Sequence, residues 1–241
     1  MLTIQNEFGQ PIGAPVPGWV PCQKPGRESM TGRFCRLEPL DPNRHAAGLF
    51  ASDTAQPDEA SWTYLPYGPF TELQKYVDWM KSYCQGDDPM FFAIVDLARQ
   101  QPVGMSSYLR ITPTHGVIEV GHLHFSPAMR QTPIATEAMF LMMQRAFTLG
   151  YRRYEWKCNS LNAPSRSAAQ RLGFSFEGIF RQAAVHKGRS RDTAWYAIID
   201  SEWPSLRDAF QQWLNPDNFD DDGRQRISLS ELTRPLLKNR G

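Results

Sequence analysis

A turn between a predicted strand and a predicted helix, residues 125–138, holds the residue types best suited to bind an anion. It reads FSPAMRQTPIATEA, so an apolar strand end is followed by Arg130, a proline and several small residues. The first turn of a helix has backbone N–H groups without intrahelical partners, and the helix dipole adds partial positive charge there. With the guanidinium of Arg130 beside it, such a turn can hold a diphosphate. Many similar turns bind nothing, so the pattern alone decides little.

A second series of residues downstream supports the interpretation. Asn162–Ser165 reads NAPS, and it is followed by Leu172-Gly173-Phe174 and then Glu177-Gly178. Together with the RQTPIA and ATEA of the turn, this series resembles the acyl-CoA motifs of the GNAT N-acetyltransferase superfamily in order and spacing, most closely those of the branch containing the ribosomal-protein N-terminal acetyltransferases. The resemblance covers roughly residues 33–203. It implies the α/β (α+β) GNAT acyl-CoA N-acyltransferase fold, a mixed central sheet flanked by helices and splayed between its fourth and fifth strands.

The resemblance also implies a co-substrate, acetyl-CoA, and no metal. Its diphosphate is expected on the amides of Ile134, Ala135 and Thr136 at the start of the helix that follows the turn, with Thr132 supplying a hydroxyl. Asn162 can cap its own helix and also hydrogen-bond the pantetheine arm, and Arg166 either pairs with a CoA phosphate or is solvated. The residues expected to contact acetyl-CoA are Phe125, Arg130, Gln131, Thr132, Ile134, Ala135, Thr136, Asn162, Ser165 and Arg166.

Three departures from the family pattern stand out. Pro133 replaces the usual glycine and removes one amide donor, although proline fits the first position of a helix. Ala169 occupies the place where many GNAT enzymes have a tyrosine general acid. The stretch 182–185 reads QAAV and lacks the carboxylate that some relatives use as a base.

Acetyl transfer to an amine needs a base for the ammonium proton, donors for the oxyanion and a proton for the leaving thiolate. By resemblance, a free N–H on the bulged strand 119–125 serves the oxyanion. Glu119 is the first candidate base; strict alternation puts it on one face with Phe125, and His122 and His124 on the other. The two histidines remain alternative bases, because a bulge would break this parity. Ser165 is expected to orient or relay the proton of the thiolate.

The elements that must position these residues follow from periodicity and caps. Strands are predicted at 34–38, 90–97, 103–111, 117–125 and 153–158, with a hairpin formed by 174–185 and 193–200. Helices are predicted from Asp41-Pro42, over 71–83 and 134–149, from Asn162 to Gly173, and over 204–214.

Composition bounds the organisation of the 241 residues. Residues 1–32 form an extended Pro/Gly-rich arm, 33–214 the acetyltransferase domain and 215–241 a polar tail. A net charge of +1 gives no general attraction to nucleic acid or an anionic membrane. No apolar run approaches the ~18 residues of a membrane span. Four scattered cysteines without a C-x-x-C pair are typical of a reducing cytoplasm.

The sequence therefore predicts a cytoplasmic N-acetyltransferase that moves acetyl directly from acetyl-CoA to a primary amine. The acceptor is a small-molecule or peptide amine: a protein N-terminus, an amino acid or aminoacyl compound, or a polyamine-like molecule. Aromatic residues between 62 and 70 are expected to shape its pocket. A homodimer is possible. The alternative is a catalytically weak CoA-binding or dimeric interaction protein on the same fold.

Overall fold

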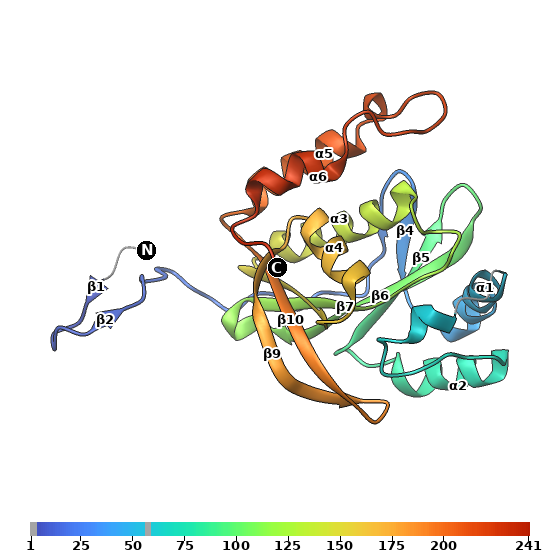
Figure 1. The fold of residues 1–241 in the computed structure, drawn as a ribbon, viewed down its shortest axis with the longest axis horizontal. Helices are drawn as coiled ribbons and strands as arrows, with labels where there is room; N and C mark the ends of the chain where they lie inside the picture. The colour runs from blue at the N-terminus through green and yellow to red at the C-terminus, as the bar shows by residue number, and fades with distance from the viewer. Residues whose placement is uncertain (1–3, 56–58) are drawn as a thin grey trace.

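A computed structural model describes residues 4–55 and 59–241 and shows one eight-stranded mixed sheet with helices on both faces (Figure 1). The strand order is β3-β4-β5-β6-β7-β8-β10-β9, and every neighbouring pair is antiparallel except β7 and β8. The strands are β3 (Met30–Thr31), β4 (Cys35–Pro39), β5 (Met90–Asp96), β6 (Gln101–Thr112), β7 (Val117–Phe125), β8 (Arg153–Asn159), β9 (Ser175–His186) and β10 (Arg189–Ile199). The strands predicted within residues 33–203 are present, within a few residues at their ends.

One face of the sheet is covered by α1 (Pro42–Thr54) and α2 (Leu73–Tyr83). Asp41 caps α1 by accepting the N–H of Asn43, and proline follows it at the first helical position, as predicted. A short 3₁₀ helix, η1 (Glu59–Trp62), stands between the two helices, and its buried Trp62 packs against Tyr76 of α2 and against Phe70.

The other face is covered by α3 (Pro133–Thr148) and α4 (Ala163–Arg171), and the larger apolar core lies between them and the sheet. Asn162 caps α4, its side chain accepting the N–H of Ser165 at 3.1 Å. The cap fixes the start of α4 beside the end of β8, so Ser165 is placed at that strand's carboxyl end.

The parallel pair β7–β8 is the point where the sheet opens. Its register covers only Val117–Val120 on β7 against Arg153–Trp156 on β8, and both strands continue beyond this pairing. Counting from β4, these are the fourth and fifth strands, so the predicted splay is confirmed.

A bulge lies in β7 at the same level. Gly121 pairs with Ser107 on β6 and His124 pairs with Met105, so His122 and Leu123 oppose the single residue between them. His122 has φ of 51°, the left-handed region that few non-glycine residues adopt. The extra residue shifts the alternation of side chains along the rest of β7.

The N-terminal arm is anchored at its end and free at its tip. Trp19 donates its indole N–H to the Thr114 carbonyl, and Cys22 contacts the Gly150 carbonyl with its thiol. Further out, β1 (Ile4–Gln5) and β2 (Pro11–Ile12) form a small hairpin that projects from the domain, with Phe8 77% exposed (Figure 1). Trp19 therefore packs against its own domain.

The C-terminal segment packs onto the domain. After α5 (Trp203–Leu214) the chain forms η3 (Pro216–Asn218), α6 (Leu229–Thr233) and η4 (Arg234–Leu236). Leu229 is fully buried, and the Thr233 hydroxyl donates to the carbonyl of Arg171 in α4. Residues 215–241 are thus folded against α4 and α5, despite their polar composition. Among the described residues, no helix has the length and apolar content to cross a bilayer.

Candidate active site

A cavity of about 1080 Å³ opens at the splay between β7 and β8. Its walls come from the second half of β7, the end of β8, the start of α4, the β9–β10 hairpin and the loop that follows η1. Seven of the candidate catalytic and CoA-binding residues from the sequence line it: Glu119, His122, His124, Phe125, Arg130, Asn162 and Ser165. The unpaired strand ends explain the cavity, because no hydrogen-bond ladder closes the sheet there.

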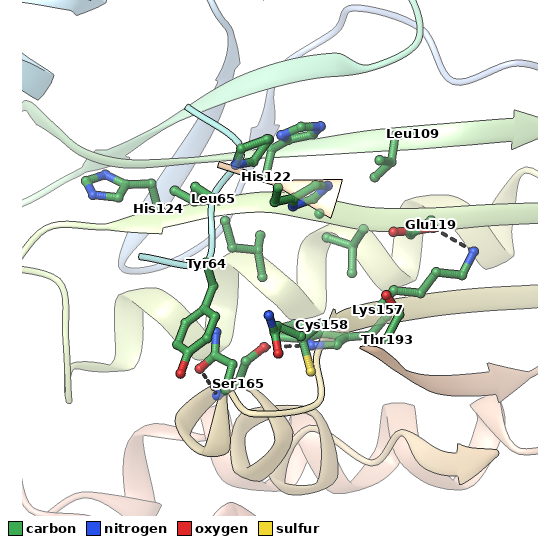
Figure 2. Close-up of a pocket in the computed structure, with 18 of the residues that line it drawn as sticks. Tyr64, Leu65, Leu109, Glu119, His122, His124, Lys157, Cys158, Ser165 and Thr193 are labelled. Carbon is green, nitrogen blue, oxygen red and sulfur yellow. Dashed lines mark hydrogen bonds and ion pairs between the residues drawn. The ribbon is translucent and has the colours of Figure 1, made fainter. Parts of the chain in front are cut away.

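Glu119 is the buried carboxylate of the cavity (Figure 2). One of its oxygens lies 2.8 Å from the Lys157 ammonium and 3.4 Å from Nε of Arg110. Lys157 also pairs with Glu155 at 2.7 Å and lies 3.7 Å from the centre of the Trp195 ring. Burial raises the pKa of Glu119 above its ordinary value, and the two cations oppose that rise without cancelling it. A carboxylate with a raised pKa is a better proton acceptor near neutrality.

The bulge brings both histidines to the face of β7 that carries Glu119. The expectation that Glu119 shares a face with Phe125 and lies opposite both histidines is therefore wrong, because the extra residue shifts the side-chain alternation from His122 onward. The two remain distinct in their surroundings, however.

His122 faces the cavity and contacts aromatic rings. The Tyr67 hydroxyl lies 3.0 Å from its Nδ1, and the rings of Tyr83 and Phe91 lie beside it. Burial, with Arg110 adding repulsion, lowers the pKa of His122 to about 4. The imidazole is therefore neutral at pH 7 and only a weak base.

His124 has both ring nitrogens engaged. Its Nε2 lies 3.2 Å from the Ser61 hydroxyl, its Nδ1 lies 3.4 Å from a carboxylate oxygen of Asp53, and the ring stacks on Trp62 with centroids 3.8 Å apart. These contacts fix the ring within the α1–α2 layer. Of the three candidate bases, Glu119 has the surroundings best suited to accept a proton in the cavity.

Ser165 lies on the opposite side of the opening from Glu119. Its hydroxyl oxygen accepts the indole N–H of Trp156 at 3.1 Å. Because an indole can only donate, Trp156 does not use the hydroxyl proton of Ser165. The tyrosine position of other family members, Ala169, is fully buried in the core and adds nothing to the cavity.

The roof of the cavity is built from two segments that meet across it. The Tyr64 hydroxyl donates to the carbonyl of Leu161, just before α4, at 3.2 Å. The Lys187 ammonium, at the tip of the β9–β10 hairpin, donates to the carbonyl of Trp62 at 2.9 Å. The basic hairpin tip is therefore partly engaged with the η1 segment.

Comparisons with known proteins agree with this geometry. The family described as acetyltransferase (GNAT) domain matches residues 35–175, more than half of the chain. The chain belongs to the GNAT acetyltransferase family. It is 46% identical to a GCN5-related N-acetyltransferase from Brucella melitensis, whose crystal structure matches at a TM-score of 0.89 over 91% of this chain and all of that one.

Two further relatives are more distant. A probable acetyltransferase of the GNAT family from Chromobacterium violaceum is 40% identical, with a TM-score of 0.75 over 81% of this chain and 98% of that one. An uncharacterized N-acetyltransferase of Bacillus subtilis is 25% identical over 58% of this chain and 81% of its own length. One structural neighbour from Vibrio cholerae carries the name of a ribosomal-protein-serine acetyltransferase; at 17% identity and a TM-score of 0.58 it shares the fold.

Members of the GNAT family use acetyl-CoA, and the start of α3 fits its diphosphate in part. Pro133 is the first residue of α3 and has no N–H, whereas Ile134 and Ala135 hold amides that precede the first intrahelical bond. The Thr132 hydroxyl already donates to the Met129 carbonyl at 2.7 Å. Arg130 donates from Nε to the carbonyl of Phe125 at 3.2 Å, which holds it at the mouth of the cavity.

Some residues of the motifs have structural contacts instead. The Thr136 hydroxyl accepts from Arg171, and its amide is the first that α3 uses itself. The next residue, Glu137, is buried and accepts three backbone N–H groups, those of Arg33, Phe34 and Cys35, at 2.7–2.8 Å. The carboxylate of the ATEA motif thus anchors the start of β4.

Two other predicted contact residues lie apart from the cavity lining. Arg166 donates to the Tyr196 hydroxyl and the Ser160 carbonyl, so its guanidinium is directed toward the sheet. Gln131 adopts φ of 59° in the tight turn before α3. Their contact with acetyl-CoA stays a prediction.

Sequence reasoning missed three positively charged residues that line the cavity: Arg110, Lys157 and Arg191. Lys157 lies two residues after Glu155 on a strand of mixed pattern, and only the register of β8 against β7 and β10 reveals that it meets Glu119. Arg191 lies near the start of β10. Alternation along β10 could have placed it on one face with Thr193 and Trp195.

Proposed function

We propose that this GNAT acetyltransferase moves an acetyl group from acetyl-CoA directly to a primary amine in the cavity between β7 and β8. The observation that carries the proposal is that Glu119 and Ser165 line one cavity from opposite sides of the strand opening. A base for the amine and a donor for the leaving sulfur are therefore both present where the two substrates would meet.

Acetyl-CoA supplies the activated thioester, and the chain's residues hold it in three places. Arg130 and the Ile134 and Ala135 amides at the start of α3 would bind the diphosphate. The unpaired edge of β7 would take the pantetheine arm, with Asn162 close to it on the facing side. This arrangement directs the sulfur end toward Ser165.

The proton transfers follow from the surroundings of the two side chains. Glu119 accepts a proton from the entering ammonium, helped by the burial that raises its pKa. The neutral amine then attacks the thioester carbonyl, and a backbone N–H freed by the bulge in β7 stabilises the oxyanion. As the carbon–sulfur bond breaks, the amine nitrogen loses its second proton and the departing sulfur gains one, relayed by the Ser165 hydroxyl while Trp156 donates to the Ser165 oxygen.

The acceptor enters from the side of α1 and α2. That side of the cavity is lined by Tyr64, Leu65, Tyr83 and His122, so the acceptor site is narrow and aromatic, as expected of the segment around residues 62–70. Cytoplasmic location and a homodimer are part of the proposal.

The test is release of free thiol from acetyl-CoA in the presence of a panel of primary amines, with mass spectrometry of the products. Acetylated amine formed in step with the thiol supports the proposal. Thermal stabilisation by CoA with no turnover of any amine would contradict it and favour a CoA-binding protein. Accumulation of an acetylated chain before product appears would contradict direct transfer.

A further inference from the structure

One wall of the cavity carries Arg191, a guanidinium that forms no ion pair with a carboxylate of the described residues. Arg191, on β10, donates from Nε to the Thr193 hydroxyl and lies with NH1 3.2 Å from Nδ1 of His186. Both partners are uncharged at neutral pH, because burial together with the nearby cations lowers the pKa of His186. Within residues 4–55 and 59–241, Arg191 forms no ion pair.

The carboxylates that line the cavity are occupied elsewhere. Glu119 is held by Lys157 and Arg110. Asp88 accepts the backbone N–H groups of Arg110 and Ile111 at 2.8 and 2.9 Å, which fixes the end of β6. Arg191 is partly buried and forms no direct ion pair, although the charge of Glu119 acts on it from a distance, and a guanidinium in that state favours an anionic ligand.

Arg191 lies in the part of the cavity where the acceptor amine is proposed to bind. Thr193 and Trp195 share its cavity wall, and Trp195 pairs in register with Lys157, the partner of Glu119. The charge of Arg191 acts to lower the pKa of both His122 on β7 and Cys158 on β8. All three residues line the cavity, so Arg191 faces the opening between these strands. The start of α3, where the CoA diphosphate is proposed to bind, contributes no residue to this wall.

An aromatic surface separates Arg191 from Glu119 in the cavity. Phe180 and Trp195 stack with ring centroids 4.4 Å apart, and both line the cavity. A molecule with its amine at Glu119 and an anionic group at Arg191 would lie along these rings. A polyamine in the same place would set a second ammonium against Arg191.

We propose that the acceptor is a small amine bearing an oxyanionic group, a carboxylate or a phosphate, which the unpaired guanidinium of Arg191 binds. This inference rests on the proposed function and narrows its acceptor class. The planar guanidinium can form paired hydrogen bonds with either group, so Arg191 selects for charge and geometry together.

Matched acceptors test the proposal. The first set compares 3-aminopropionate, O-phosphoethanolamine and propylamine, and the second compares phenylalanine with phenethylamine. With the wild type, kcat/KM for at least one anion-bearing amine exceeds that of its uncharged match by about tenfold or more, the range of a charged hydrogen bond. The first set also separates a carboxylate from a phosphate acceptor.

Variants of Arg191 test whether this residue causes the preference for anion-bearing amines. Arg191→Gln brings the ratio close to one, Arg191→Lys restores part of it, and KM for acetyl-CoA is unchanged in both. Arg189→Gln is the matched control, because it removes an exposed positive charge from the same hairpin. Melting temperatures of all three variants show whether the hairpin stays folded.

A binding measurement needs no turnover. Calorimetry with CoA present compares N-acetylphenylalanine with N-phenethylacetamide, and O-phospho-N-acetylethanolamine with N-propylacetamide. If an anionic ligand binds to the wild type and Arg191→Gln abolishes that binding, the anion subsite is supported. This holds even if no amine is acetylated; in that case only the proposed acetyl transfer is refuted. Acetylation of amines without any preference for an anionic group overturns this inference and leaves the transfer intact. A preference that persists in Arg191→Gln, or no anion-dependent binding, also overturns it.

Discussion

The two halves of β7 differ in their pairing, and the difference defines the site. Val117–Val120 is hydrogen-bonded to strands on both sides and adds Ile118 and Val120 to the core. Gly121–Phe125 keeps β6 as a neighbour but separates from β8 and contains the bulge. Glu119, at the end of the paired half, points into the cavity that the unpaired half opens.

The comparison teaches that one change of backbone produces several features of the site together. An extra residue at His122 and Leu123 reverses the side-chain alternation, leaves backbone groups without ladder partners and increases the local twist. The paired half holds Glu119 rigidly between Lys157 and Arg110, while the unpaired half provides the space. The predictions below alter one half at a time.

The largest expected effect comes from replacing Glu119, the carboxylate at the end of the paired half of β7. Glu119→Gln lowers kcat by about 100-fold, the scale of a lost general base, and changes KM for acetyl-CoA little. In the wild type the rate falls as pH decreases through the pKa of Glu119, which burial raises, because the base must be ionised. Steady-state kinetics over a range of pH measure both effects.

Glu155→Gln is the matched control for that variant. Glu155 binds the same Lys157 but is absent from the cavity lining, so kcat should stay within a few-fold of the wild type. A rise in KM for acetyl-CoA with unchanged kcat in Glu119→Gln would remove Glu119 from the chemistry.

Filling the unpaired half has the next largest effect. A Cβ at Gly121 would lie 2.9 Å from a terminal carbon of Leu109, so Gly121→Ala pushes that side chain within the cavity. We expect kcat/KM for the acceptor to fall by about tenfold, because small displacements of a bound reactant are costly. CoA affinity, measured by calorimetry, should be unchanged. The double variant Gly121→Ala/Leu109→Ala should recover activity, and no recovery would contradict this steric explanation.

Removing the charge of Arg130, at the proposed CoA diphosphate site, should have a weaker effect. Arg130→Gln is expected to lower CoA affinity by about five- to tenfold at low salt, and by less at high salt, since the charge is partly exposed. Titration calorimetry at two ionic strengths measures the effect. Arg181→Gln, a charge removed from an exposed position of β9, serves as the control. Equal affinity of Arg130→Gln and the control would mean that the α3 turn holds no phosphate.

At neutral pH, the smallest effect belongs to His122. Its pKa is about 4 in the folded chain and about 6.5 when unfolded, so between these values the unfolded state binds more protons. The free energy of unfolding is therefore unaffected by this group well above pH 6.5, and falls by about 3 kcal/mol as pH decreases to 4. Urea denaturation of wild type and His122→Gln at several pH values isolates this contribution. A difference between the two proteins that is constant with pH would refute the shift.

The sequence allowed the elements of the domain to be predicted well because their signals are local. Asp41-Pro42 and Asn162 are cap residues before apolar periodic segments, and the limits of β7 match its apolar run between turn residues. The splay followed from the family resemblance. These features depend on neighbours within a few positions or on motifs with fixed spacing.

The bulge and the charge network could not be predicted in the same way. A positive φ at His122 is imposed by the pairing of β7 with β6, and histidine is not a residue that signals it. The meeting of Glu119 with Lys157 depends on strand register across the sheet. Likewise, the burial of Leu229 in the C-terminal segment depends on contacts with the distant α4 and α5.

A crystal structure of the protein with CoA bound tests the central claim most directly. The predicted result has the diphosphate on the Ile134 and Ala135 amides beside Arg130, and the sulfur within hydrogen-bonding distance of Ser165, between the separated ends of β7 and β8. A diphosphate bound away from α3, or a sulfur outside the opening between these strands, would contradict it.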